Sequence, residues 1–122
     1  MRFLLMLACL AVVGCGESDR EVFTLAGLRP EHVAAVQDAA LVVNADTGSG
    51  IRFQEIAPSG FLYATIPLAG FADCNEHRCI ITFNTDISSG SFPGIAKHEF
   101  GHVAGLQHVC DYYNYMHSQD AC

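Results

Sequence analysis

Three histidines and one glutamate stand within the eleven residues HEFGHVAGLQH, which run from His98 to His108. His98 and His102 are four positions apart, so a helix would place both imidazoles on one face, within reach of a single zinc ion. Glu99 is rotated by about 100° from His98, which is too far for a third ligand but close enough to reach a water molecule on the zinc. Gly105 can adopt the left-handed conformation that ends a helix, so the chain can turn and return His108 to the metal. Three neutral nitrogen ligands would leave a fourth position open for water, which is the arrangement of a catalytic zinc site.

A purely structural role for these histidines is the competing interpretation. An amphipathic helix can bury a histidine in a protein core, but the ring then needs a polar partner. Three histidines on one otherwise apolar helix would need several such partners at once. No serine or thiol nucleophile stands in a comparable setting, so the pattern favours metal chemistry.

The motif resembles the signature of a known peptidase family. HEFGHVAGLQH matches the HExxHxxGxxH pattern of the metzincin zinc peptidases. That family also has a methionine turn beneath the metal, and Met116, eight residues after His108, stands at a spacing that looks matrixin-like. The resemblance implies that His98, His102 and His108 bind one Zn²⁺, that Glu99 is the general base, and that Met116 forms an apolar floor. It implies peptide-bond hydrolysis as the reaction and extends over about residues 21–122.

The resemblance also implies how a substrate would bind. The strand at 79–85 would form the upper rim of the cleft, and its open edge would take a peptide as an added strand. An ordinary paired core strand is the alternative. The segment 109–115, which contains Tyr112, Tyr113 and Tyr115, would line the pocket next to the cleaved bond. Val109 follows the third histidine, where known subfamilies have a characteristic Ser, Asp, Glu or Pro, so the subfamily stays open. Ser118 stands where astacins have a zinc-binding tyrosine, so that fifth ligand is not expected.

The elements that must hold this site can be read from hydrophobic periodicity. Val33, Val36, Ala40 and Val43 recur at helical spacing after Pro30. Alternation and β-branched residues indicate strands elsewhere. We expect strands at 21–25, 51–56, 61–68 and 79–85, and helices at about 30–45 and from about 93. The fold class is therefore α+β: a minimal metzincin-like domain with a small twisted mixed sheet, two main helices and the zinc in a cleft. His32 and His77 are expected at the surface and His117 in a solvated loop, and donation from His117 to the reaction oxyanion is the alternative.

The N-terminal segment has the pattern of an export signal. Arg2 precedes the apolar stretch 3–13, which is too short to span a bilayer as a helix. Val12-Val13-Gly14-Cys15 resembles the lipobox of bacterial lipoproteins, in which the cysteine becomes the lipidated N-terminus. We therefore expect a signal peptide at 1–14, a lipid-bearing Cys15 with a tether to residue 20, and the catalytic domain at 21–122. Ordinary signal cleavage, with Cys15 uninvolved, is the alternative.

Four further cysteines, Cys74, Cys79, Cys110 and Cys122, follow the signal. An even number in an exported protein indicates disulfides. Proximity along the chain favours the pairs Cys74–Cys79 and Cys110–Cys122, although four cysteines permit three pairings. Free buried thiols or a second metal site are the alternatives.

Length and charge limit the remaining possibilities. The chain has 122 residues and a formal charge of -7, so one domain is expected and nucleic acid is a poor partner. We expect a monomeric zinc metalloendopeptidase that acts on peptides or proteins. We expect it in the cell envelope, where a lipid anchor would hold it to the outer membrane or cell surface. Full secretion is the less favoured location. Two other functions remain open: a surface lipoprotein that binds zinc without catalysis, and an amide or ester hydrolase that uses the same site.

Overall fold

The computed structural model describes residues 19–122, and the predicted signal, Cys15 and most of the tether lie outside that range. The elements follow in the order η1 (Asp19–Glu21), β1 (Val22–Phe23), α2 (Pro30–Thr47), β2 (Arg52–Phe53), β3 (Gly60–Ala64), β4 (Gly70–Cys74), β5 (Cys79–Asn84), α3 (Phe92–Val103) and η2 (Gln119–Ala121). None of the helices in the described part of the chain has the length and apolar character that crossing a membrane requires. The predicted α+β class, with two main helices and mixed strand pairing, is confirmed.

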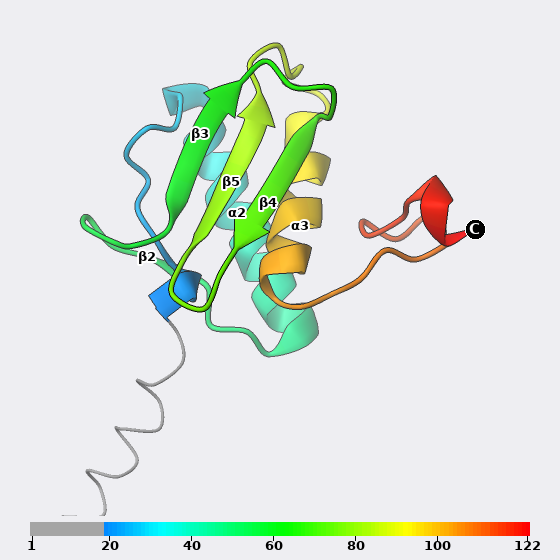
Figure 1. The fold of residues 1–122 in the computed structure, drawn as a ribbon, viewed down its shortest axis with the longest axis horizontal. Coiled ribbons are helices and arrows are strands. Elements are labelled where there is room, and N and C mark those ends of the chain that lie inside the picture. Colours follow the sequence, from blue (N-terminus) through cyan, green and yellow to red (C-terminus); the bar gives the residue numbers. More distant parts are fainter. Residues whose placement is uncertain (1–18) are drawn as a thin grey trace, which may run out of the picture.

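The strands form two small sheets that lie next to each other. In the larger sheet the order is β3-β5-β4, with β3 parallel and β4 antiparallel to β5. In the smaller sheet β1 pairs with β2 in parallel, and a parallel bridge from Phe23 to Ser59 joins it to the start of β3. Helices α2 and α3 lie together on one face of the larger sheet (Figure 1). The C-terminal segment after α3 extends away from this layer (Figure 1).

Helix α2 buries the predicted face at Val36, Ala40 and Val43, but His32 takes the place of Val33 in it. The buried residues include His32, Val36 and Val43, whereas Val33 is only half-buried. His32 lies one turn before Val36 and therefore occupies the same face. The prediction that His32 is a surface residue is wrong: its ring is 4% exposed, stacks on Phe92 at 3.7 Å between centroids, and its Nδ1 lies 2.7 Å from the hydroxyl of Tyr63.

An aromatic core joins the helices to the sheet. Phe100 of α3 makes edge-to-face contacts with Phe23 and Phe61, and Phe83 of β5 stacks with Phe61. These four rings are at most 5% exposed, so the helix that carries the histidine motif is anchored by large buried side chains. Such packing restricts α3 to one position relative to the sheet.

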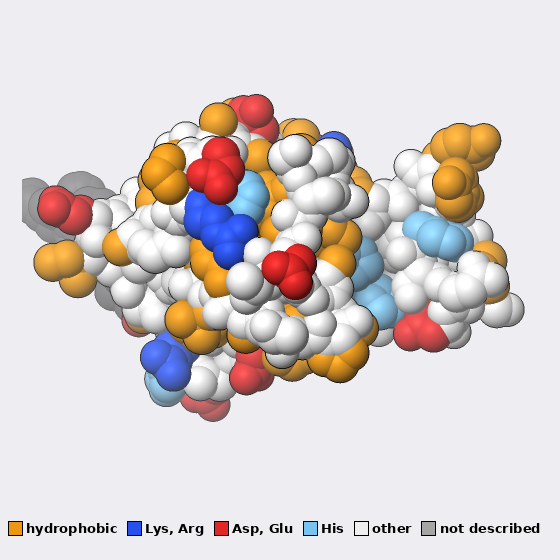
Figure 2. Space-filling view, turned by 90° about the horizontal axis from the view of Figure 1, so that it is seen from above, with side chains coloured by type: hydrophobic (Ala, Val, Ile, Leu, Met, Phe, Trp, Pro, Cys, Tyr) orange, Lys and Arg blue, Asp and Glu red, His pale blue; other side chains and the backbone are white. Residues whose placement is uncertain are grey.

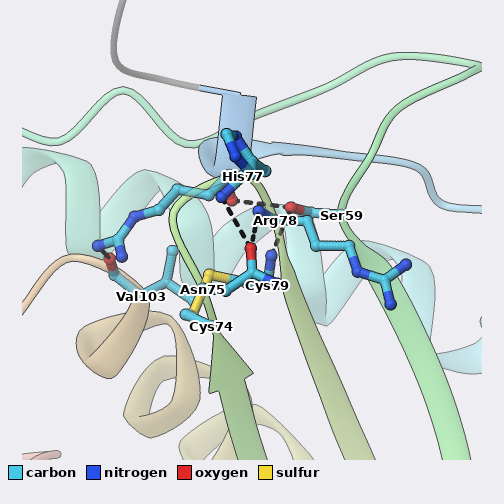
Figure 3. Close-up of a disulfide and its surroundings, with 8 residues drawn as sticks. Ser59, Cys74, Asn75, His77, Arg78, Cys79 and Val103 are labelled. Atoms are coloured by element: carbon cyan, nitrogen blue, oxygen red, sulfur yellow. Dashed lines mark hydrogen bonds between the residues drawn. A yellow bond between two sulfur atoms is a disulfide. The ribbon is translucent and has the colours of Figure 1, made fainter.

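A disulfide closes the turn between β4 and β5. Cys74 at the end of β4 is bonded to Cys79 at the start of β5, as predicted (Figure 3). In the intervening turn, the side-chain oxygen of Asn75 accepts hydrogen bonds from the backbone N–H groups of His77 and Arg78 (Figure 3). His77 is exposed there, as predicted.

The observed strands differ from the predicted ones in three ways. β4 (Gly70–Cys74) was not predicted, because its sequence GFADC contains glycine, alanine and aspartate, which have low strand propensity. β5 is the central strand of the larger sheet and has no open edge, so it is not the rim of the cleft. The edge beside α3 belongs to β4. The strands predicted at 21–25 and 51–56 are each reduced to two residues, and the strand predicted at 61–68 ends at Ala64.

Candidate metal centre

The turn at the end of α3 brings the third histidine back towards the helix. Gly105 has φ +95°, so the predicted left-handed conformation is confirmed. The backbone N–H of Leu106 donates to the carbonyl of Gly101 at 2.8 Å, and that of Gly105 to His102 at 3.0 Å. These are the two hydrogen bonds of a Schellman motif, which stops the helix and reverses the chain direction. His108, which lies beyond the end of α3, is therefore turned back towards the helix.

The three predicted ligand histidines form a compact triangle. The ring centroids are 4.8 Å apart for His98 and His102, 4.8 Å for His102 and His108, and 5.1 Å for His98 and His108. Their candidate ligand atoms all lie within 4.8 Å of one another, and the two Nε2 atoms of His102 and His108 are 3.1 Å apart. The trio can hold a metal ion.

Hydrogen bonds at the other ring nitrogen orient each imidazole. Nδ1 of His98 lies 2.9 Å from the carbonyl oxygen of Tyr115, and Nδ1 of His102 lies 3.0 Å from that of Leu106. A carbonyl can only accept, so each Nδ1 carries the proton and donates it. Nε2 of His102 is then unprotonated and lies 3.1 Å from Nε2 of His108. That arrangement fits a cation between the rings.

Burial favours the neutral form of the histidine at the centre of the trio. The pKa of His102 is lowered mainly by desolvation, while the hydrogen bond to the Leu106 carbonyl acts in the opposite direction. The charges of His98 and His108 lower it further. Only the neutral ring binds a metal, so the lowered pKa of His102 suits a ligand.

Glu99 is buried beside the trio but is not one of its members. Glu99 is 5% exposed, and burial raises its pKa to about 7, an effect that a positive charge on His108 would oppose. A carboxyl group with a pKa near neutrality, placed in a cleft, has the property of a general base or acid. It stands one position after His98 in α3, and the group of converging ligand atoms does not include it.

Met116 lies beneath the helix that carries the histidines. Its side chain is 2% exposed, and a Cβ built at Gly101 would overlap its sulfur atom. The tight turn around it is closed by hydrogen bonds from the Val109 N–H to the Met116 carbonyl at 2.9 Å and from the Met116 N–H to the Asn114 side chain at 2.7 Å. Met116 therefore packs against α3 at Gly101.

The histidines lie between two adjoining cavities. The larger, of about 790 Å³, is lined by His98, Glu99 and the segment Leu68–Ala72, which leads into and includes most of β4. The smaller, of about 570 Å³, is lined by the turn after α3 and by the C-terminal residues Asp120 and Ala121. Figure 2 shows histidine side chains (pale blue) where the C-terminal part meets the body of the molecule.

Other residues predicted near the site fall into two groups. Tyr115 and His117 line the larger cavity, and the Nδ1 atom of His117 is buried with no hydrogen-bond partner within residues 19–122. Tyr112 and Tyr113 are 78% and 93% exposed and do not line it. The predicted lipid-bearing Cys15 lies outside the described residues.

Asp120 is a site residue that the sequence did not reveal. Its two carboxylate oxygens lie 3.0 and 3.1 Å from Nδ1 of His108. The pKa of Asp120 is lowered first by a hydrogen bond from Ser118 and then by the one from His108. The predicted disulfide Cys110–Cys122 is present and closes this part of the chain. An aspartate twelve residues after a histidine forms no motif. In the sequence, only the predicted Cys110–Cys122 disulfide could have indicated that Asp120 lies near His108.

The chain was compared with protein-family models and with curated proteins. No protein-family model matches the chain, and no match is found among curated proteins. The histidine trio, its hydrogen-bonded supports and the buried glutamate are therefore the basis on which a function can be argued.

Proposed function

We propose that this protein is a zinc-dependent metallopeptidase of the metzincin type. The observation that carries the proposal is the convergence of His98, His102 and His108 next to a buried Glu99, in a cleft beside a strand edge. Three nitrogen ligands with a neighbouring carboxylate are the parts of a catalytic metal site rather than a structural one. The anchoring of this enzyme to the cell envelope through Cys15 is part of the same proposal.

The donor set suits zinc. A tetrahedral zinc site has Zn–N distances of about 2.0–2.1 Å, which separate two ligand nitrogens by about 3.3 Å. The Nε2 atoms of His102 and His108, 3.1 Å apart, are already near that separation. Imidazole nitrogens with their Nδ1 protons donated to oxygen acceptors are the usual supported ligands of zinc. When bound, zinc polarises a carbonyl group and lowers the pKa of a coordinated water.

Glu99 supplies the proton transfers in this proposal. Its carboxylate borders the larger cavity, so it can take a proton from the attacking water and give it to the leaving amine. Burial raises its pKa to about 7, which makes the acceptance and release of a proton comparable in cost near neutral pH. Glu99 thus serves as base in the first step and as acid in the second.

The free edge of β4 is the proposed place for the substrate backbone. β4 pairs only with β5 within the described residues, and its other edge adjoins the larger cavity. An extended peptide can pair with such an edge, which would lay its scissile bond next to the histidines. The sequence predicted that the strand at 79–85 would pair with the substrate peptide at an open edge. We assign that role to β4 instead.

A single substitution tests the proposed chemistry. Glu99→Gln keeps the shape of the side chain but removes the proton acceptor. We expect the full-length variant to bind one zinc per chain like the unmodified protein and to cleave casein or a peptide library about 10²–10⁴-fold more slowly. Glu76→Gln is the matched control, because the Glu76 side chain is 84% exposed at the β4–β5 turn. Its cleavage rate should be unchanged.

The same assay separates the other functions that the site permits. Cleavage that a hydroxamate inhibits supports a peptidase. Zinc binding without any turnover would indicate a non-catalytic zinc-binding lipoprotein, and turnover of small esters or amides alone would indicate a different hydrolase. Full activity of Glu99→Gln would rule out Glu99 as the base.

A further inference from the structure

The third histidine differs from the other two in how its ring is held. His98 and His102 project from α3, and each donates its Nδ1 proton to a backbone carbonyl. His108 lies beyond the helix in a segment without regular structure. Its Nδ1 donates instead to the carboxylate of Asp120, which is the one carboxylate within residues 19–122 that accepts from any of the three. A side chain from the C-terminus therefore sets the orientation of this ring.

A disulfide joins the segment that carries Asp120 to the segment that carries His108. Cys110 stands two residues after His108, and Cys122 stands two residues after Asp120. The bridge between the two cysteines holds their Cα atoms 4.9 Å apart, so the preceding residues are brought side by side. Asp120 itself is in the short turn η2 and is largely exposed, with 68% of its side chain accessible. Ser118 also holds this segment: its side chain donates a hydrogen bond to Asp120, and its backbone N–H donates to the carbonyl of Val109, next to His108, at 3.0 Å.

We propose that Asp120 is a positioning residue that orients His108 for metal binding, and that the Cys110–Cys122 disulfide delivers it. A carboxylate on the far nitrogen of a ligand histidine fixes the tautomer, aligns the ring and makes the ligand nitrogen more basic. The other two rings donate to neutral carbonyl groups. Of the three histidines, only His108 therefore has a negative charge at its Nδ1 that makes the ligand nitrogen more basic. The inference rests on the proposed function only in that the trio binds zinc.

Zinc affinity of the full-length chain, measured by competition with a chromophoric chelator, tests the role of Asp120. Asp120→Asn keeps the size and an acceptor oxygen but removes the charge, and we expect it to weaken zinc binding by about 10- to 100-fold. Asp111→Asn is the matched control. It removes the same charge within the same disulfide-bounded loop, and Asp111 contacts the Tyr113 backbone rather than a histidine. Its zinc affinity should equal that of the unmodified protein.

The role of the disulfide is tested by replacing both cysteines with serine. The Cys110→Ser/Cys122→Ser variant should lose zinc affinity by a factor similar to that of Asp120→Asn. Adding Asp120→Asn to it should cause little further loss, because two changes that act through one contact are not additive. Losses that multiply in the triple variant would show that the bridge does not act through Asp120.

Two further measurements separate positioning from a general loss of structure. The melting temperature of metal-free Asp120→Asn should match that of the unmodified chain, while the visible absorption of its Co²⁺ form should change. Unchanged zinc affinity in Asp120→Asn, or an equal loss in Asp111→Asn, overturns the proposal. Peptide cleavage plays no part in the test, so a zinc-binding protein without peptidase activity would end the proposed function and leave this inference standing.

Discussion

Gly101, the fourth residue of the HExxH motif, has no side chain because Met116 lies against it. A Cβ at this position would overlap the sulfur of Met116 and lie 3.4 Å from the ring of Tyr115. We expect Gly101→Ala to destabilise the protein by about 1–3 kcal/mol, the usual cost of overpacking a close contact. Urea denaturation, monitored by circular dichroism, measures this change.

Gly94 provides the control for that substitution. It lies in the same helix, and a Cβ built there meets nothing within 4 Å. Gly94→Ala should stabilise the protein by about 0.5–1 kcal/mol, because alanine loses less conformational freedom in a helix. If Gly101→Ala is also stabilising, Met116 does not pack against the helix as described.

His32 should make the stability of the metal-free protein depend on pH. Its pKa is lowered, first by burial and then by the charge of Arg29, while Glu31 acts in the opposite direction. In the unfolded chain a histidine has a pKa near 6.5, so below about pH 6.5 the unfolded state takes up a proton that the folded state does not. The stabilisation from His32 is therefore complete above that pH and is lost as the pH falls towards the lowered value.

Two histidine variants test whether the stabilisation from His32 is lost as the pH falls. Subtracting the unfolding free energy of His32→Gln from that of the unmodified protein, at pH 7.5 and pH 5.5 with chelator present, isolates the contribution of His32. The difference should shrink on acidification. His77→Gln is the comparison variant, because the His77 side chain is 82% exposed. A difference for His32→Gln that is constant between the two pH values would contradict the prediction.

At the scale of elements, the turn after α3 should depend on the conformation of Gly105. Its φ of +95° is costly for any residue with a Cβ, although no atom would obstruct one. We expect Gly105→Ala to cost about 1–2 kcal/mol in stability. Zinc binding should also weaken, because the altered turn moves His108 away from His98 and His102.

The measurement for this turn compares zinc affinity with stability. Gly105→Asn is the informative second variant, because asparagine tolerates the left-handed conformation better than alanine does. It should recover part of both losses. If alanine and asparagine weaken zinc binding equally, the left-handed turn is not what places His108.

At the scale of the whole molecule, bound zinc should link the helix to the C-terminal segment. His98 and His102 come from α3, whereas His108 belongs to the segment that extends from the body of the fold (Figure 1). A ligand that binds only the folded state stabilises it by about 4 kcal/mol at a thousand times its dissociation constant. We therefore expect chelation to lower the melting temperature by about 10 °C or more.

The comparison that tests this linkage uses a ligand variant. His102→Ala should melt at the same temperature with and without chelator, whereas Glu99→Gln should keep the full zinc-dependent shift. Calorimetry of the full-length chain gives both values. Equal melting temperatures for the zinc-loaded and chelated unmodified protein would mean that the trio does not hold the metal in the folded state.

The sequence by itself determined the parts of this protein that depend on local spacing. Helical periodicity put His98 and His102 on one face, and a glycine at Gly105 predicted the turn that follows. Cysteines close along the chain predicted both disulfides, since short loops close readily. Each of these features follows from contacts within about twelve residues.

Only the tertiary structure decided the features that join distant segments. It placed β5 in the centre and β4 at the edge beside α3, buried His32 against Phe92, and set Asp120 on His108. Strand order depends on which edges pair across the sheet, and the burial of a helix residue depends on what packs over it. Local periodicity carries neither kind of information, because both are properties of surfaces that meet only when the chain has folded.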